Sequence, residues 1–187
     1  PHHQAMNQTS LTLLAWITAT SAVGNQEILS RDNASGGGGR IFQFRLESGV
    51  LHFIPFFSGS PVITYKGTRS LVDGKPHLVA ATLGAGFVRL YIDNRLEYEA
   101  AETRALDVST MSFALGRNTV ASSQFFVGIQ RGGLLLPAAL TPAQMGVLGA
   151  LPYLYHCRAS HAALLALQRS ALLLRLQAEG LYVGSQM

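Results

Sequence analysis

The sequence has little cysteine and little charge of either sign. Its 187 residues include one cysteine, Cys157, so no disulfide can form within the chain and a disulfide-stapled secreted domain is excluded. Charged residues make up 13% of the chain, roughly half the share that is usual in soluble domains. Because 48% of the residues are hydrophobic, intrinsic disorder, which requires low hydrophobicity and high charge, is excluded as well.

Basic residues are few and scattered, although the formal net charge is +4. Lys66 and Lys75 are the only lysines, and the arginines are spread from Arg31 to Arg175 without a cluster. Nucleic-acid binding usually requires a dense basic face, so the sequence predicts no nucleic-acid partner. No window reaches about 18 uncharged apolar residues, which predicts no transmembrane helix. Residues 1–4 show no basic leader before an apolar run, which predicts no signal peptide.

Short runs of alternating hydrophobic and polar residues, separated by turn signals, dominate the first 130 residues. Leu11, Leu13, Ala15 and Ile17 share one face of the first run, and Gly84-Ala85-Gly86 marks a tight hairpin. We expect strands at 11–17, 27–30, 41–46, 50–57, 61–65, 78–83, 87–92, 96–100, 112–115 and 125–129. Strands at a spacing of about 8–12 residues predict an all-β sandwich or barrel.

Two helices are expected after this β region. Thr141-Pro142-Ala143-Gln144 has the pattern of a helix start, with Thr as N-cap, Pro at the first helical position and Gln three residues after the cap. Gly146 and Gly149 predict that this helix is short. A second, Leu-rich helix is expected at residues 160–179, with Gly180 as its C-cap.

The Leu-rich helix is apolar over more than half of its circumference, so we expect it to be buried. Four of the residues expected at its interface with a partner follow a spacing typical of one helix face, and a fifth, Leu176, widens that face: Leu164, Leu167, Ala171, Leu174 and Leu176. We therefore divide the chain into a β-sandwich at 1–150 and a helical extension at 151–187. The extension is expected to pack on the sandwich or on a partner subunit, which favours a homo-oligomer or another multisubunit assembly.

A hairpin in the middle of the chain resembles a known family. His77-Leu78-Val79-Ala80 and Leu90-Tyr91-Ile92-Asp93-Asn94 follow the family order W-H-H-V-A and then L-Y-V-D-G, with Lys75 or Pro76 in place of the tryptophan. The resemblance is to the concanavalin A-like lectin/glucanase superfamily, in its laminin G-like and pentraxin-like branch. It covers about residues 8–150 and implies an antiparallel jelly roll of two packed sheets.

The sequence lacks the catalytic pattern of the glucanases in this superfamily. Those enzymes carry E-x-D-x-E on one strand, where alternation brings the carboxylates into one cleft. Here Glu97 and Glu99 share an expected strand and Glu102 follows, which we interpret as a solvated strand face. His52 and His77 lie in apolar strands and are interpreted as structural. The sequence therefore predicts that the protein is not an enzyme.

The loops at the rim of the expected sandwich hold the candidate ligand residues: Arg31, Asp32, Asn33, Arg117 and Asn118. Laminin G-like modules often bind calcium through rim aspartates, so the resemblance implies Asp32 and Asp107 as candidate calcium ligands. Calcium prefers several oxygen ligands, and the chain has few acidic residues to supply them. No other cofactor is expected.

Three functions remain open. The first is a non-catalytic recognition or adhesion module on a larger assembly, with a glycan as candidate ligand. The second is a structural or decoration protein of a multisubunit particle such as a virion, assembled in a reducing cytoplasm. It is favoured by the absence of disulfides, the low charge and the Leu-rich helix. The third, a glycan hydrolase or lyase, lacks a catalytic carboxylate pair.

Overall fold

The computed structural model describes residues 9–32, 39–119 and 124–149. All of them belong to the first of two compact units, residues 1–149 and 150–187. The Leu-rich helix expected at 160–179 therefore lies outside the described residues, together with its expected interface residues Leu164, Leu167, Ala171, Leu174 and Leu176.

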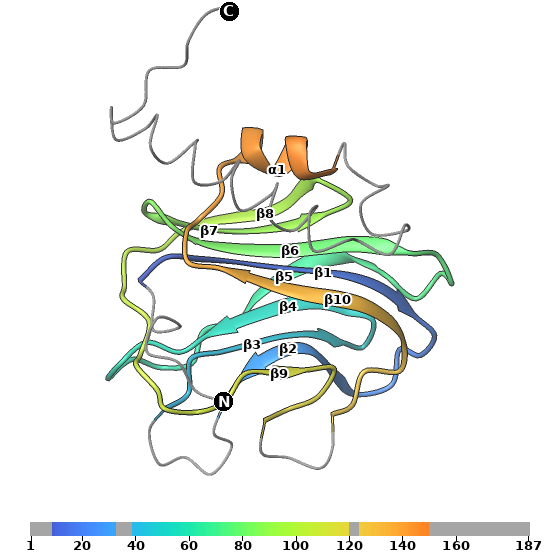
Figure 1. Cartoon of the computed structure of the whole chain (residues 1–187), viewed down its shortest axis with the longest axis horizontal. Helices are drawn as coiled ribbons and strands as arrows, with labels where there is room; N and C mark the ends of the chain where they lie inside the picture. The colour runs from blue at the N-terminus through green and yellow to red at the C-terminus, as the bar shows by residue number, and fades with distance from the viewer. Residues whose placement is uncertain (1–8, 33–38, 120–123, 150–187) are drawn as a thin grey trace, which may run out of the picture. The chain divides into compact units, whose positions relative to one another are not determined.

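The described residues form two antiparallel sheets of five strands each, followed by one short helix (Figure 1). In chain order the elements are β1 (Leu11–Ala19), β2 (Asn25–Arg31), β3 (Phe42–Glu47), β4 (Val50–Pro55), β5 (Tyr65–Ser70), β6 (His77–Gly84), β7 (Phe87–Ile92), β8 (Arg95–Ala101), β9 (Ala114–Leu115), β10 (Gly128–Leu136) and α1 (Pro142–Gly149). The mainly β class is confirmed. Of the sandwich and the barrel that the turn spacing allows, the structure is the sandwich, with the two packed sheets that the family resemblance implies.

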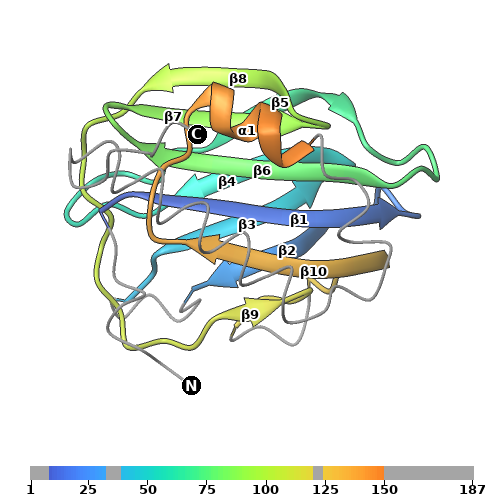
Figure 2. The ribbon, with the colours of Figure 1, turned by 45° about the horizontal axis from the view of Figure 1, so that its top comes forward.

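Each sheet combines neighbouring and distant parts of the sequence. The first sheet has the order β10-β1-β6-β7-β8, and the second has the order β5-β4-β3-β2-β9 (Figure 2). Neighbouring strands along the chain pair with one another from β2 to β5 in the second sheet and from β6 to β8 in the first. The first sheet is completed by β1 and β10, which come from opposite ends of the described chain.

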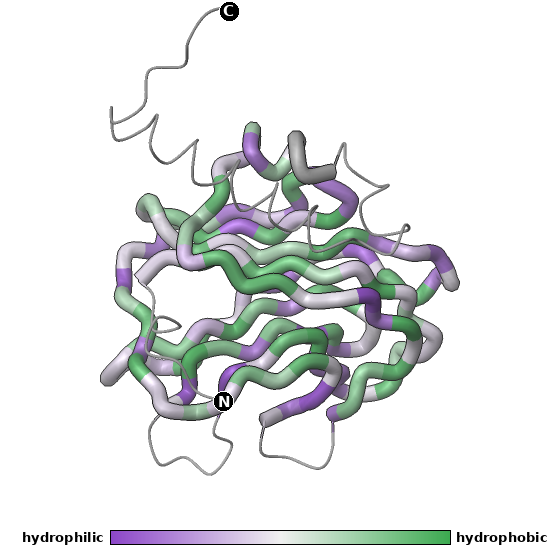
Figure 3. Tube along the Cα trace, viewed as in Figure 1, coloured by the Kyte–Doolittle hydropathy of each residue, from purple (hydrophilic) through white to green (hydrophobic). Residues whose placement is uncertain are grey.

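The core lies between the sheets and follows the alternation in the sequence. In β1, Leu11, Leu13, Ala15 and Ile17 all point inward, as their spacing predicts. From the facing sheet, residues of β3 and β4 join them, and Phe44 and Phe53 form an edge-on pair with ring centroids 6.5 Å apart. Figure 3 shows hydrophobic residues in both sheets, interrupted by hydrophilic ones. Burial of each large side chain contributes about 1.5–3 kcal/mol, so this core dominates the stability of the domain.

Two expected strands lie later in the sequence than predicted. The strand expected at 61–65 is β5, which begins only at Tyr65, because Pro61 has no N–H to donate to a sheet. The strand expected at 125–129 is β10, which begins at Gly128 and includes the leucines at 134–136. These leucines pair with β1, so the strand continues well beyond its expected end at Ile129.

Helix α1 begins where its capping sequence predicts. The Thr141 N–H donates to Gln144 Oε1 over 2.8 Å, and the Gln144 N–H donates back to Thr141 Oγ1 over 3.3 Å. This reciprocal pair satisfies two N–H groups that the first turn leaves without helical partners. Both ribbon views place α1 beside the first sheet (Figures 1 and 2). No helix in the described part of the chain has the length and apolarity needed to cross a membrane.

His77, in the hairpin that resembles the family motif, connects two turns. Its Nδ1 lies 2.9 Å from Asp93 Oδ2, and its Nε2 lies 3.0 Å from Asp73 Oδ1. Asp93 also accepts a hydrogen bond from the Leu78 N–H over 3.0 Å. These contacts give His77 a structural role, as expected.

Two glycines differ in how closely other atoms pack around them: Gly128 at the start of β10 and Gly146 in α1. Gly128 has φ +148°, and a Cβ at this position would overlap the carbonyl oxygen of Thr18. We expect Gly128→Ala to lower the free energy of unfolding by about 2–3 kcal/mol. In α1 a Cβ at Gly146 would meet no atom within 4 Å, so Gly146→Ala should raise the free energy by up to about 1 kcal/mol. Urea denaturation measures both effects, and equal effects would contradict the assigned packing.

Candidate functional site

The outer face of the second sheet carries a row of polar residues. Glu27 of β2, Arg45 of β3, His52 of β4 and Lys66 of β5 are register partners across four strands. They point away from the core because the residues adjacent to them along the strands, such as Phe44 and Phe53, point into it. We call these four residues the outer row.

A pocket of about 340 Å³ opens beside the outer row. It is lined by Asp32, Arg40, Gln43, Arg45, Ile54, Phe56, Val62, Thr64, Asn118 and Gln124. Ile54, Phe56 and Val62 provide an apolar wall, and the remaining residues are polar or charged. The guanidinium of Arg40 lies 3.9 Å from the centroid of the Phe56 ring. The pocket therefore places hydrogen-bonding groups beside an apolar surface.

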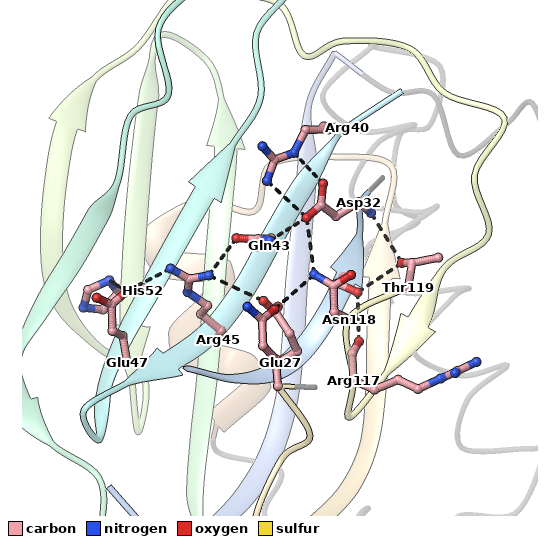
Figure 4. A network of polar contacts seen from close by, with 12 residues as sticks. Glu27, Asp32, Arg40, Gln43, Arg45, Glu47, His52, Arg117, Asn118 and Thr119 are labelled. Atoms are coloured by element: carbon pink, nitrogen blue, oxygen red, sulfur yellow. Dashed lines mark hydrogen bonds and ion pairs between the residues drawn. The ribbon is translucent and has the colours of Figure 1, made fainter. Parts of the chain in front are cut away.

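Asp32 organises the polar and charged residues of the pocket, which we call the polar wall (Figure 4). Its carboxylate is fully buried and accepts hydrogen bonds from Arg40 Nε over 2.5 Å and from Arg40 Nη2 over 3.2 Å. Gln43 Nε2 and Asn118 Nδ2 donate to the same carboxylate over 2.5 and 3.3 Å. Such charge-assisted bonds are stronger than neutral ones, so Asp32 fixes the orientation of three pocket side chains.

Gln43 connects this network to the outer row. Its Oε1 accepts a hydrogen bond from Arg45 Nη1 over 2.9 Å. Arg45 Nη2 donates to Glu47 over 2.9 Å, and Glu47 Oε2 lies 3.4 Å from Nδ1 of His52. Burial lowers the pKa of His52. Figure 4 shows Arg45 between Gln43, Glu27 and Glu47.

Glu27 is a buried carboxyl group beside Arg45. Its Oε1 lies 3.7 Å from Arg45 Nη1, and neither carboxyl oxygen has a hydrogen-bond partner in the described part of the chain. Burial raises the pKa of Glu27 to about 8, and the nearby Arg45 offsets only part of this effect. At neutral pH Glu27 is therefore mostly protonated and does not neutralise the charge of Arg45.

The expected ligand residues occupy different positions. Asp32 and Asn118 line the pocket. Arg31 is buried instead, and it donates to the carbonyl oxygens of Ser109 and Met111 over 2.6 and 3.1 Å.

Arg117, another expected residue, contributes no side chain to the pocket network. The Arg117 carbonyl accepts a hydrogen bond from the Ser30 hydroxyl over 2.9 Å, and the Arg117 side chain points away from the network in Figure 4. Asn33 lies outside the described residues.

Glu27, Arg40, Gln43 and Arg45 were not among the expected ligand residues. The sequence does contain a signal for two of them, because Gln43 and Arg45 alternate with the core residues of β3. That alternation places them on the outer face, but it does not show that a pocket lies there.

The surroundings of Asp32 do not fit calcium. Its carboxylate is already bound by a guanidinium and two amide groups, all of which are hydrogen-bond donors. Asp107, the other candidate, accepts a hydrogen bond from the N–H of the next residue, Val108, and is not part of the pocket. Within residues 9–32, 39–119 and 124–149 there is no cluster of three or more His, Cys, Asp or Glu residues suited to a metal ion.

The carboxylates of β8 and the residue that follows it each have a separate structural contact. Glu97 accepts hydrogen bonds from the N–H and hydroxyl of Thr68, over 2.8 and 2.6 Å, and Glu99 pairs with Arg89. Glu102 is buried, so the expected solvated face is wrong at this position. It accepts hydrogen bonds from Arg104 and, to a smaller effect, from Tyr65, and these bonds lower the pKa of Glu102 to about 2.

The raised pKa of Glu27 predicts a specific dependence of stability on pH. Between pH 4.5 and about 8 the unfolded chain releases this proton while the folded chain keeps it, so stability falls as pH rises. At about 1.4 kcal/mol per pKa unit, the effect at pH 7 is on the order of 3 kcal/mol. Glu27→Gln should remove it and raise the free energy of unfolding at pH 7 more than at pH 5.

Urea denaturation at both pH values measures this difference. The control is Glu99→Gln, which removes a carboxylate on the other sheet. An equal gain at pH 5 and pH 7 for Glu27→Gln would show that Glu27 is ionised in the folded protein.

Comparisons with solved structures show the same fold. The CBM40 domain of a Ruminococcus gnavus IT-sialidase has a TM-score of 0.62 at 15% identity, with 76% of this chain and 84% of that chain covered. The binding domain of botulinum neurotoxin DC, in complex with SialylT, has a TM-score of 0.59 at 13% identity, with 79% and 37% covered.

A Bacteroides ovatus protein, provisionally assigned to carbohydrate binding, has a TM-score of 0.58 at 19% identity, with 73% and 40% covered. The chain thus spans less than half the length of the Bacteroides and toxin structures. None of the curated proteins compared with the chain matches it. The laminin G profile of the concanavalin A-like lectin/glucanases superfamily matches residues 1–145. By this match, which spans most of its length, the chain belongs to the concanavalin A-like lectin/glucanases superfamily.

Proposed function

We propose that this domain is a non-catalytic module that binds a glycan in the pocket of the second sheet. The observation that carries the proposal is the arrangement of Asp32, Gln43 and Asn118 beside the apolar wall of Ile54, Phe56 and Val62. A sugar ring presents hydroxyl groups at its edge and C–H groups on its faces, so it can contact both parts of the pocket. Binding sites commonly combine an apolar lining with a few fixed polar groups.

The polar wall is organised before any ligand arrives. Asp32 holds Arg40, Gln43 and Asn118 in place, so a ligand does not have to order these side chains. The structural relatives support the same ligand class: one is a sialidase CBM40 that has also been solved with α2,3-sialyllactose, and another is a toxin binding domain in complex with SialylT. Family membership supports it as well.

A binding role without catalysis is supported by the positions of the acidic residues. Glu97, Glu99 and Glu102 have separate structural partners. At the pocket, the buried carboxylate of Asp32 accepts hydrogen bonds from Arg40, Gln43 and Asn118, which favours a role in positioning these side chains over a role as nucleophile or base.

Binding to a glycan array, followed by calorimetry on the glycans that bind, tests the proposal. We expect Asn118→Ala and Gln43→Ala each to weaken binding by about tenfold, because each removes hydrogen-bonding groups from the pocket. The control variant Glu99→Gln, on the other sheet, should bind with unchanged affinity. If no glycan binds the folded wild-type protein, the proposal is wrong. Release of reducing sugar would instead support an enzyme.

The alternative, a structural subunit of a larger particle, is favoured by an exposed apolar row. Phe125, Val127 and Ile129 alternate along one extended segment and are 46–53% exposed. Exposed apolar clusters often mark protein interfaces. Light scattering tests this alternative: Val127→Ser with Ile129→Ser should convert an oligomer to a monomer if the row is the interface. An unchanged mass for the double variant would remove this support.

A further inference from the structure

We infer that the pocket selects glycans that carry an acidic group, a carboxylate or a sulfate, and that Arg45 is the residue that receives this group. The inference rests on the proposed function, because it assigns a ligand class to the same pocket.

The charged groups of the pocket wall do not balance. One carboxylate, Asp32, faces two guanidinium groups, those of Arg40 and Arg45. Asp32 forms its ion pair with Arg40, at a distance of 2.5 Å. Arg45 is left with Glu47, whose side chain is 41% exposed and so is screened by water, and with Glu27, which is mostly protonated at neutral pH. The pocket therefore keeps an excess of positive charge at Arg45.

Arg45 also has N–H donors that its described hydrogen bonds do not use. A guanidinium has five N–H donors, and the described contacts of Arg45 use one on Gln43 and one on Glu47. Its side chain is only 12% exposed, so an anion bound there is poorly screened by water. The planar arrangement of arginine donors suits the oxygens of a carboxylate or sulfate group, with two parallel hydrogen bonds.

Glu27 is an internal competitor for the same guanidinium. While Glu27 is protonated, an incoming anion is the stronger partner of Arg45. When Glu27 ionises, its carboxylate lies 3.7 Å from Arg45 Nη1 and repels a ligand anion. The affinity for an acidic glycan should therefore fall as pH rises through about 8.

The other titratable groups of the outer row, His52 and Lys66, also favour binding of an anion. Protonation of His52, whose Nδ1 lies 3.4 Å from Glu47 Oε2, adds positive charge to the outer row at low pH. Lys66 is the register partner of His52 and adds a further positive charge to the row. Asp32 and Arg40 form an ion pair with each other, so together they add no net charge that would offset the positive charge of His52 or Lys66.

The test uses matched pairs of glycans: glucuronate-terminated against glucose-terminated, sulfated against unsulfated, and sialylated against asialo oligosaccharides. Calorimetry at pH 6 should give at least about tenfold tighter binding for the acidic member of one pair. Arg45→Gln should remove this preference, whereas Arg45→Lys should retain part of it. The control Arg95→Gln removes the same charge from the other sheet and should leave the preference unchanged.

The pH dependence provides a second measurement that a purely structural role of Arg45 would not change. Wild-type affinity for the acidic glycan should decrease between pH 7 and pH 9, and Glu27→Gln should make it constant over that range. Equal affinity for the acidic and neutral members would overturn the inference while leaving the proposed function in place. Failure to bind any glycan would overturn both. Circular dichroism establishes whether each variant is folded. If Arg45→Gln does not fold, the preference measured for Arg45→Lys is the deciding result.

Discussion

The buried carboxylate of Asp32 is the interaction on which the site depends. It joins Arg40, which precedes β3, to Gln43 within β3 and to Asn118 near the edge strand β9. Arg40 and Gln43 lie 8 and 11 residues from Asp32 in the sequence, whereas Asn118 lies 86 residues away. The pocket depends on this one carboxylate, which accepts hydrogen bonds from all three. Removing one partner of a buried ion pair typically costs about 3–5 kcal/mol, since the other charge is then left without compensation. The same interaction therefore stabilises the fold and shapes the pocket.

The fold supplies the rest of the site through alternation. Phe44 and Phe53 enter the core, so Arg45 and His52 must point out of the second sheet. The core is apolar on one side of the sheet, and the outer row is charged on the other. Glu27 lies between these environments: it points to the polar face but is buried there, which explains why its pKa is raised. Burial next to a cation makes this residue sensitive to pH in the physiological range.

The sequence predicted the fold better than the site. Strand alternation and turn residues were sufficient to place the core of β1 and β3, and the capping sequence placed the start of α1. Two of the expected ligand residues, Asp32 and Asn118, lie in the pocket. Arg31 does not, because a rim position in the sequence does not reveal whether a side chain turns inward. Arg40 and Arg45 were missed because only the pairing of β2, β3 and β4 brings them to the same surface as Asp32.

The most direct test of a glycan pocket on the second sheet is NMR of the side-chain amides during titration with a glycan selected on the array. If the glycan binds in this pocket, the amide signals of Gln43 and Asn118 shift with ligand concentration. Those of Gln26 and Gln130, which donate to backbone carbonyls outside the pocket, should not shift. Shifts at Gln26 and Gln130 with no change at Gln43 and Asn118 would contradict the account and place the ligand elsewhere on the sandwich.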